Sequence, residues 1–215
     1  HAAPPSGVTA GVIVVAVKPQ IIAGVLPALR AMIGPGTVSL SIAAGATLAN
    51  LEAGLGAVAI VRSIPNTPAM VGRGITGAIA NARVDDAGKA TIEALLRAAG
   101  DVAWVDEEGL IDAVTAVSGS GPAYVFLLAE VLAEAAEATG LPPDLAARLA
   151  RATVTGAGEL LHQSDLPPAQ LRKNVASPNG TPAAALAVLM GEGGMAPLMV
   201  RAVAAARKRS EELSG

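Results

Sequence analysis

The sequence has no cysteine and very few aromatic or histidine residues. Of its 215 residues none is Cys, two are His, and Trp, Tyr and Phe occur once each. The absence of Cys excludes disulfides and thiolate catalysis, and the wide separation of His1 and His162 disfavours a His-based metal centre or catalytic triad. We therefore expect no metal site. The chemistry must rest on hydroxyls, backbone amides, a few carboxylates or a bound cofactor.

The chain also lacks an excess of positive charge and long hydrophobic runs. Its net charge is −3 and its one basic cluster is Arg207-Lys208-Arg209, which gives no footprint for nucleic acid. Much of the hydrophobic content of 52% is alanine, and the most apolar runs, residues 11–17 and 124–129, are too short to cross a bilayer. We expect a soluble, cytoplasmic protein that binds neither nucleic acid nor membrane.

Short β-branched runs and helical patterns alternate over residues 1–117. Residues 12–17 form a continuous β-branched run, which is typical of a strand buried on both faces of a parallel sheet. Further strands are expected at 38–42, 57–62, 75–80 and 101–105. Helices are expected at 20–33, with a kink at Pro27, from Thr47 onward, and at 85–99. This alternation predicts a doubly wound α/β domain.

From Ser118 onward the sequence shows only helical patterns and turns. The run from Ser118 to Pro122 is typical of a helix start, because a hydroxyl caps a free N–H and Pro122 has no N–H to leave unpaired. That helix is expected to reach Gly140, and others are expected at 142–162, 167–175, 181–190 and 197–213. Residues 118–215 are thus predicted to form an all-α domain whose apolar helices pack against a second copy, giving a homodimer.

Three predicted strands end in short turns of small residues. These turns are Ala16-Val17-Lys18-Pro19, Ala43-Ala44-Gly45 and Pro65-Asn66-Thr67-Pro68. In doubly wound sheets ligands lie beyond the carboxyl ends of the strands. Such turns allow backbone to approach a flat or phosphorylated ligand, although strand termination alone also accounts for them.

The turn at residues 176–182 directly precedes a predicted helix. Ser177 and Thr181 offer hydroxyls, Asn179 and Gly180 tolerate positive φ, and the first helical N–H groups are expected to be free. This combination suits a carboxylate or phosphate. The alternative is an ordinary, well-capped helix connection.

Four segments together resemble the pyrroline-5-carboxylate reductase family in order and spacing: residues 16–20, 65–68, 112–124 and 177–181. The resemblance extends from Val12 to Leu213. It implies a Rossmann-like dinucleotide-binding domain (1–117, partial) followed by a helical dimerisation and substrate-binding domain (118–215). It also implies that NADPH or NADH reduces the C=N bond of 1-pyrroline-5-carboxylate, a small imino acid, to L-proline. The assembly implied is a homodimer, often within a larger ring such as a decamer.

The resemblance also implies site residues. Ala16, Lys18 and Pro19 would border the dinucleotide, with Ala44 and Gly45 nearby, and Asn66, Thr67 and Pro68 would lie near the nicotinamide and the substrate. The substrate carboxylate would be held by Val175, Ser177, Asn179, Gly180 and Thr181, with Thr181 as the catalytic residue. Asp165 would accept a hydrogen bond from the ring nitrogen, the alternative being a solvated loop carboxylate.

Two features depart from the family pattern. No strand with a G-x-G-x-x-G turn precedes Val12, so the first β-α-β unit, which would also select NADPH or NADH, is missing from this chain. We expect the intact protein to carry it; the alternative is a non-catalytic dimerisation or scaffold remnant. Pro182 stands where the family typically has threonine, which predicts weaker substrate binding. A different Rossmann dehydrogenase, such as a hydroxyacid dehydrogenase, is disfavoured. Such enzymes generally rely on a catalytic lysine, and the helical half contains only Lys173 and Lys208, neither in a setting typical of an active site.

Overall fold

The computed structural model describes residue 5 and residues 7–214. Its contacts divide the chain into two compact units. The first unit contains the residues up to Pro122 together with those from Val203 onward, and the second is Ala123–Ala202. These units are groups of residues in contact and are not necessarily the domains that fold separately. The domain boundary predicted after residue 117 therefore stays a prediction.

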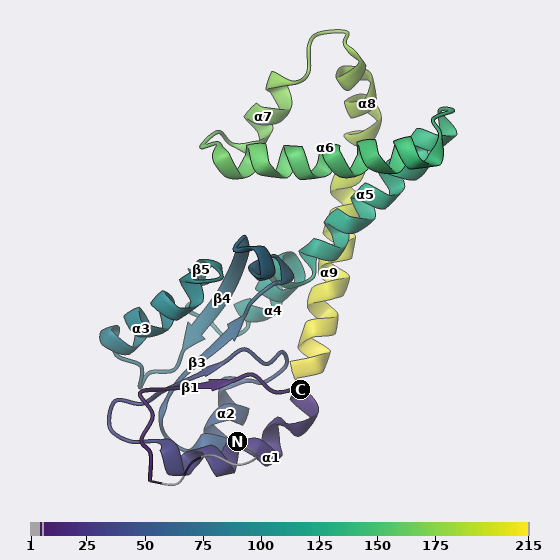
Figure 1. Cartoon of the computed structure of the whole chain (residues 1–215). Helices are drawn as coiled ribbons and strands as arrows, with labels where there is room; N and C mark the ends of the chain where they lie inside the picture. The colour runs from purple at the N-terminus through teal and green to yellow at the C-terminus, as the bar shows by residue number, and fades with distance from the viewer. Residues whose placement is uncertain (1–4, 6, 215) are drawn as a thin grey trace. The chain divides into compact units, whose positions relative to one another are not determined.

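The first unit is built on a mixed five-stranded sheet in the order β1-β2-β3-β4-β5 (Figure 1). The strands are β1 (Val12–Val15), β2 (Val38–Ser41), β3 (Ala59–Ile64), β4 (Gly74–Ala80) and β5 (Gly100–Trp104). β1, β2 and β3 are parallel, β4 runs antiparallel to β3, and β5 is parallel to β4. The reversal at β4 was not predicted. It fits the short connection after β3, which holds only the 3₁₀ helix η2 (Thr67–Val71), because parallel neighbours need a longer crossover.

Helices cover both faces of this sheet. On one face, α1 (Pro19–Leu29) and α2 (Leu48–Leu55) bury Leu26, Leu51 and Leu55 against strand residues. On the other face, α3 (Asp86–Arg97) buries Ile92 and Leu96. α1 contains Pro27 and passes directly into the 3₁₀ helix η1 (Arg30–Met32), in line with the predicted interruption. The predicted Rossmann-like α/β class is therefore confirmed.

Strand β1 is buried on one face only. Ile13 and Val15 belong to the core beneath α1 and α2, whereas Val14, on the opposite face, is 52% exposed. The prediction that this strand is buried on both faces is wrong, while all four residues of β2 are buried. The reason is that β1 is an edge strand, which among the described residues pairs only with β2. Its outer edge, and its face opposite α1 and α2, which lies beyond α3, therefore remain open.

The chain becomes helical at Leu110 rather than at residues 118–122. α4 (Leu110–Val114) leads into η3 (Thr115–Gly119), a π-helical turn, and then into α5 (Gly121–Ala138). The Ser118 hydroxyl donates back to the Val114 carbonyl at 3.0 Å instead of capping a helix. The Ser120 N–H donates to the Thr115 carbonyl, five residues earlier, at 2.8 Å. The predicted helix start is wrong because the glycine-rich run is absorbed as a π turn within a longer helix.

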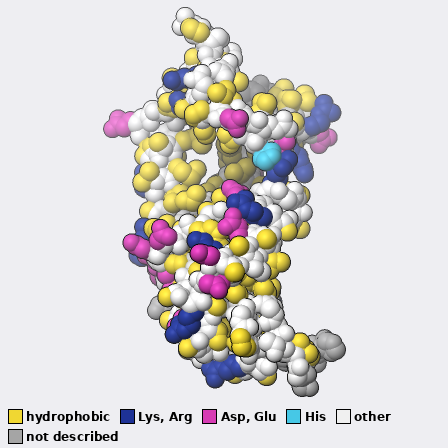
Figure 2. All heavy atoms as spheres, turned by 90° about the vertical axis from the view of Figure 1, so that its left-hand side faces the viewer, with side chains coloured by type: hydrophobic (Ala, Val, Ile, Leu, Met, Phe, Trp, Pro, Cys, Tyr) yellow, Lys and Arg dark blue, Asp and Glu magenta, His cyan; other side chains and the backbone are white. Residues whose placement is uncertain are grey.

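The second unit is helical and is formed by most of α5, by α6 (Pro143–Gln163), α7 (Pro168–Asn174) and α8 (Thr181–Leu189), and by the beginning of α9 (Met195–Ser214). The predicted helices are confirmed, and proline begins α6 and α7, where its missing N–H costs nothing. Many large apolar side chains are exposed on these helices, including Phe126 at 68% and Leu160 at 66%. Figure 2 shows hydrophobic side chains spread over the visible face of the molecule. By length and composition alone, the continuous helix Leu110–Ala138 would also suffice to cross a membrane.

Candidate functional site

The carboxyl ends of β1, β2 and β3 lie next to one another, because these strands are parallel neighbours in the sheet. The loops that follow them, together with the first residues of α1 and η2, carry all of the predicted cofactor-binding residues: Ala16, Lys18 and Pro19 after β1, Ala44 and Gly45 after β2, and Asn66, Thr67 and Pro68 after β3. The topology thus brings the predicted set to one edge of the sheet. This edge is where ligands bind in open α/β sheets.

The groups at this edge fit a phosphorylated, flat ligand. Gly45 has a φ of +76°, which only glycine adopts freely, and a Cβ there would lie 3.1 Å from the Leu213 carbonyl oxygen. Lys18 is exposed and precedes Pro19, the first residue of α1. None of the eight predicted cofactor residues is acidic, so no carboxylate among them would repel a phosphate.

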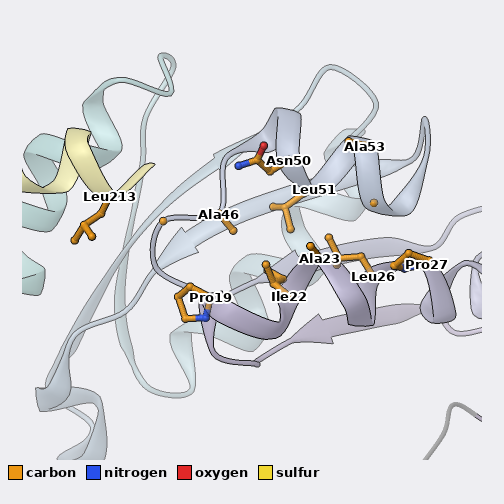
Figure 3. Close-up of a pocket in the computed structure, with 12 residues that line it drawn as sticks. Pro19, Ile22, Ala23, Leu26, Pro27, Ala46, Asn50, Leu51, Ala53 and Leu213 are labelled. Atoms are coloured by element: carbon orange, nitrogen blue, oxygen red, sulfur yellow. The ribbon is translucent and has the colours of Figure 1, made fainter. Parts of the chain in front are cut away.

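A cavity of about 580 Å³ opens beside the edge, between α1 and α2 (Figure 3). Pro19, Gly45 and Leu213 line the end nearest the predicted cofactor loops, and Asn50 is the one polar side chain among the described lining residues. An apolar crevice of this kind accepts a ring more readily than a phosphate. The sequence did not reveal Ile22 or Asn50 as lining residues, because their spacing on helices is also that of ordinary core and surface positions.

Asn66 holds three segments together through its side-chain amide. Its Nδ2 donates to the Ser118 carbonyl at 3.1 Å, and its Oδ1 accepts from the Ile75 N–H at 3.0 Å. In a regular helix the Ser118 carbonyl would accept from residue 122, but Pro122 has no N–H. Asn66 supplies the missing donor. The side chain therefore fixes the loop after β3, while the exposed Thr67 and the loop backbone remain to face a ligand.

The predicted substrate-binding residues lie in the second unit, around the start of α8. Residues 177–180 form a tight turn, closed by the Gly180 N–H donating to the Ser177 carbonyl at 3.0 Å. Asn179 has a φ of +59° and follows Pro178, as a type II turn requires. A Cβ at Gly180 would meet the Ser177 hydroxyl oxygen, so a larger residue there would require the Ser177 side chain to move. Val175 is the C-cap residue of α7, two positions before Ser177.

The start of α8 offers fewer free donors than the sequence suggested. The N–H groups of Ala183 and Ala184 both donate to the Gly180 carbonyl, at 3.1 and 3.3 Å, and Pro182 has none. Within the described part of the chain, this leaves the Thr181 N–H as the donor of the first turn that has no partner, beside the exposed Thr181 side chain. Asp165 is exposed between α6 and α7. The cofactor set belongs to the first unit and the substrate set to the second.

Comparison with known proteins relates this chain to one family of reductases. Residues 108–213 match a family described as pyrroline-5-carboxylate reductase dimerisation. The chain is 45% identical over 206 residues to the pyrroline-5-carboxylate reductase of Pseudomonas aeruginosa, covering 95% of this chain and 75% of the relative. It is 44% identical over 202 residues to that of Synechocystis, covering 94% of this chain and 74% of the relative.

Solved structures agree. A pyrroline-5-carboxylate reductase from Coxiella burnetii superposes with a TM-score of 0.90 at 41% identity, covering 96% of this chain and 77% of that one. The Plasmodium falciparum enzyme, solved with NADP bound, gives a TM-score of 0.80 at 32% identity over 95% of this chain and 78% of that one. Identity at this level across nearly the whole chain is decisive, and the chain belongs to the pyrroline-5-carboxylate reductase family.

Proposed function

We propose that this protein is an NAD(P)H-dependent reductase that converts 1-pyrroline-5-carboxylate to L-proline, the final step of proline biosynthesis. The 45% identity with the Pseudomonas aeruginosa pyrroline-5-carboxylate reductase over 95% of this chain carries the proposal. The NADP bound to the Plasmodium falciparum relative supports a dinucleotide as the cofactor.

The dinucleotide would lie across the sheet edge formed by the three loops after β1, β2 and β3. When bound, it supplies the hydride, so the protein has to align the reacting carbons rather than provide a strong base. Lys18 offers a positive charge for a phosphate, and Gly45 permits a close backbone approach. Asn66 keeps the loop after β3 in place through its bonds to Ser118 and Ile75.

The substrate would bind at the start of α8 through its carboxylate. A helix N-terminus favours an anion, and the Thr181 N–H and hydroxyl both lie there. The turn at 177–180 would add the Ser177 hydroxyl and the Asn179 side chain, and Asp165 would accept from the ring nitrogen. Pro182 contributes neither a hydroxyl nor an N–H, so we expect weaker binding than with threonine at this position.

We infer that the helical unit pairs with a second copy, and that such dimers build a larger ring, a decamer, in the cytoplasm. The dimerisation family match over residues 108–213 includes the apolar helix Leu110–Ala138, which supports a protein partner for that helix. Glu130, Glu134 and Glu137 along α5 support the same choice, because charges within a membrane span are costly.

A direct assay of NADPH or NADH oxidation tests the reaction. The purified protein, expressed from its complete coding sequence, should oxidise NADPH or NADH only when pyrroline-5-carboxylate is present. Thr181→Val keeps the shape but removes the hydroxyl, and it should lower kcat/KM by about 10-fold or more. Thr139→Val is the matched control, because the Thr139 hydroxyl donates a hydrogen bond to the Ala136 carbonyl at 2.7 Å and is not one of the predicted site residues. A dimer with no dinucleotide binding and no turnover would instead identify a non-catalytic scaffold.

A further inference from the structure

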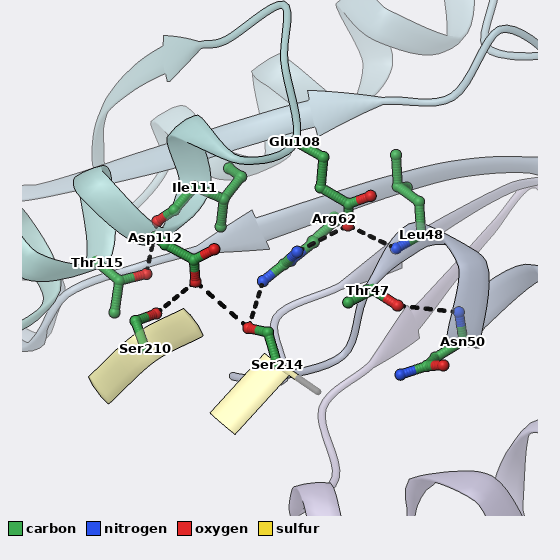
Figure 4. A network of polar contacts seen from close by, with 10 residues as sticks. All are labelled: Thr47, Leu48, Asn50, Arg62, Glu108, Ile111, Asp112, Thr115, Ser210 and Ser214. Atoms are coloured by element: carbon green, nitrogen blue, oxygen red, sulfur yellow. Dashed lines mark hydrogen bonds and ion pairs between the residues drawn. The ribbon is translucent and has the colours of Figure 1, made fainter. Parts of the chain in front are cut away.

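A buried polar network lies under the carboxyl edge of the sheet, within the first unit (Figure 4). Arg62, within β3, is 2% exposed; its Nη1 donates to Glu108 Oε1 at 2.7 Å, and its Nη2 donates to the Ser214 hydroxyl at 3.4 Å. Asp112 is 8% exposed and accepts from the hydroxyls of Ser210 at 2.6 Å and Ser214 at 3.3 Å. The network thus joins β3 and α4 to the last turn of α9.

The same network reaches the loop between β2 and α2 (the β2–α2 loop, residues 43–47). Glu108 Oε1 also accepts from the N–H of Leu48, the first residue of α2, at 2.7 Å. On its other side the loop meets α9 itself, since the Leu213 carbonyl oxygen lies 3.1 Å from where a Cβ of Gly45 would be. The loop is therefore held from two sides, by Glu108 and by the end of α9.

The buried charge of Arg62 makes its position depend on its hydrogen-bond partners. Burying a guanidinium is unfavourable unless its donors are bonded, and the Nε of Arg62 has no hydrogen-bond partner among the described residues. Its place then depends on the bonds to Glu108 and Ser214. The Ser214 hydroxyl in turn donates to Asp112, so an unbroken series of hydrogen bonds runs from the end of α9 through Arg62 and Glu108 to the start of α2.

We propose that the last turn of α9 positions the β2–α2 loop for dinucleotide binding, with Arg62, Glu108 and Asp112 as positioning residues. The part that concerns the dinucleotide rests on the proposed function. The last turn of α9, which is far from this loop in sequence, then sets the affinity for the dinucleotide, although it contains none of the predicted cofactor-binding residues.

The test compares the full-length protein with the double variant Ser210→Ala/Ser214→Ala. The matched control is Glu211→Gln, which changes the same turn but removes only an exposed pair with Arg207. We expect amide hydrogen exchange at residues 44–48 to be about 10-fold faster in the double variant, and the Kd for NADPH, followed by its fluorescence, to rise about 10-fold. The control should change neither, and Ser214→Thr in the parent, which keeps both hydroxyls, should stay close to the parent in both measurements.

The possible outcomes separate the two ideas. Loop exchange that stays unchanged, or that rises only in parallel with every protected amide of the first unit, overturns the positioning role. Faster loop exchange with an unchanged Kd overturns its link to the dinucleotide. A parent protein that binds no NADPH refutes the proposed function, and the exchange data alone then decide whether α9 positions the loop. If the double variant does not fold, Ser214→Ala alone gives the same comparison.

Discussion

One backbone carbonyl that lacks a donor within its helix helps to fix the loop at the sheet edge. Pro122 leaves the Ser118 carbonyl without a helical donor, and the Asn66 amide fills that vacancy while also accepting from Ile75. One asparagine therefore couples the loop after β3 to a π turn more than fifty residues away, since positions 66 and 118 are 52 apart. The motif residues Asn66 and Pro122 are explained by one shared hydrogen bond.

Replacing Asn66 with Asp tests this coupling. The carboxylate keeps the acceptor for Ile75 but loses the donor to Ser118, so Asn66→Asp should lower the free energy of unfolding by about 2 kcal/mol in urea titrations near neutral pH. Pro122→Ala adds an N–H for the Ser118 carbonyl, and in the Asn66→Asp background it should recover about 1 kcal/mol more than in the parent. Equal effects of Pro122→Ala in both backgrounds would show that the two residues are not coupled.

At the scale of elements, local signals located most helices and strands. The Thr47 side chain caps α2 by accepting from the Asn50 N–H at 3.1 Å, and the Asp85 side chain caps α3 by accepting from the Gly88 N–H at 2.8 Å. The errors arose where neighbours decide the outcome. β1 has the composition of a doubly buried strand but only one covered face, and the Ser118 run has the composition of a helix start but lies within a helix.

The candidate site was predictable to a similar degree. Its loops could be placed together, because the carboxyl ends of parallel strands share one edge. The contact between Arg62 and Ser214 could not, because it joins residues 152 positions apart with no local pattern to link them. The loss of free donors at α8 was also hidden, since it depends on how Ala183 and Ala184 share the Gly180 carbonyl.

Helix α3 is fastened to β5 by a surface cluster whose strength depends on pH. The Trp104 indole N–H donates to Glu93 at 3.0 Å, and Arg97 pairs with the same carboxylate at 2.9 Å. These contacts, Trp104 first and Arg97 second, hold the pKa of Glu93 below its ordinary value of 4.5. A lowered carboxylate pKa stabilises the fold fully above 4.5, and this contribution disappears as the pH falls below that value.

We therefore expect Glu93→Gln to reduce stability near neutral pH and to flatten the loss of stability below pH 4.5. Urea midpoints measured across the acid range give the comparison. Glu107→Gln, at an exposed glutamate of the same unit, should leave the profile as in the parent. A Glu93→Gln profile parallel to that of the parent through the acid range would rule out this carboxylate as a source of the pH dependence.

At the scale of the whole molecule, the two units differ in how they satisfy their apolar residues. The first unit contains the three clusters of buried hydrophobic residues. In the second, α5 has no buried residue, and Phe126, Leu127 and Leu128 are 68%, 55% and 42% exposed. A helix that is apolar on most sides is stable in water only when another surface covers it. The dimerisation family match over the same residues indicates that this surface is a second copy.

A charge placed on α5 should therefore break the assembly before it affects the fold of the first unit. We expect Phe126→Glu and Leu128→Glu to weaken dimerisation by about 100-fold, because a carboxylate buried in an apolar interface loses its hydration without gaining a partner. Analytical ultracentrifugation should show the parent at twice the chain mass of 21.1 kDa or a multiple of it, and the variants moving toward a single chain.

Glu137→Gln, also on α5, is the control, since it changes the charge without adding one to an apolar position. It should leave the mass unchanged. The circular dichroism of the sheet and the urea transition of the first unit should persist in the two charged variants, because that unit has its own core. A parent that sediments as a single chain at all concentrations would remove α5 as an assembly surface, and variants that remain dimeric would place the interface on other helices of the second unit.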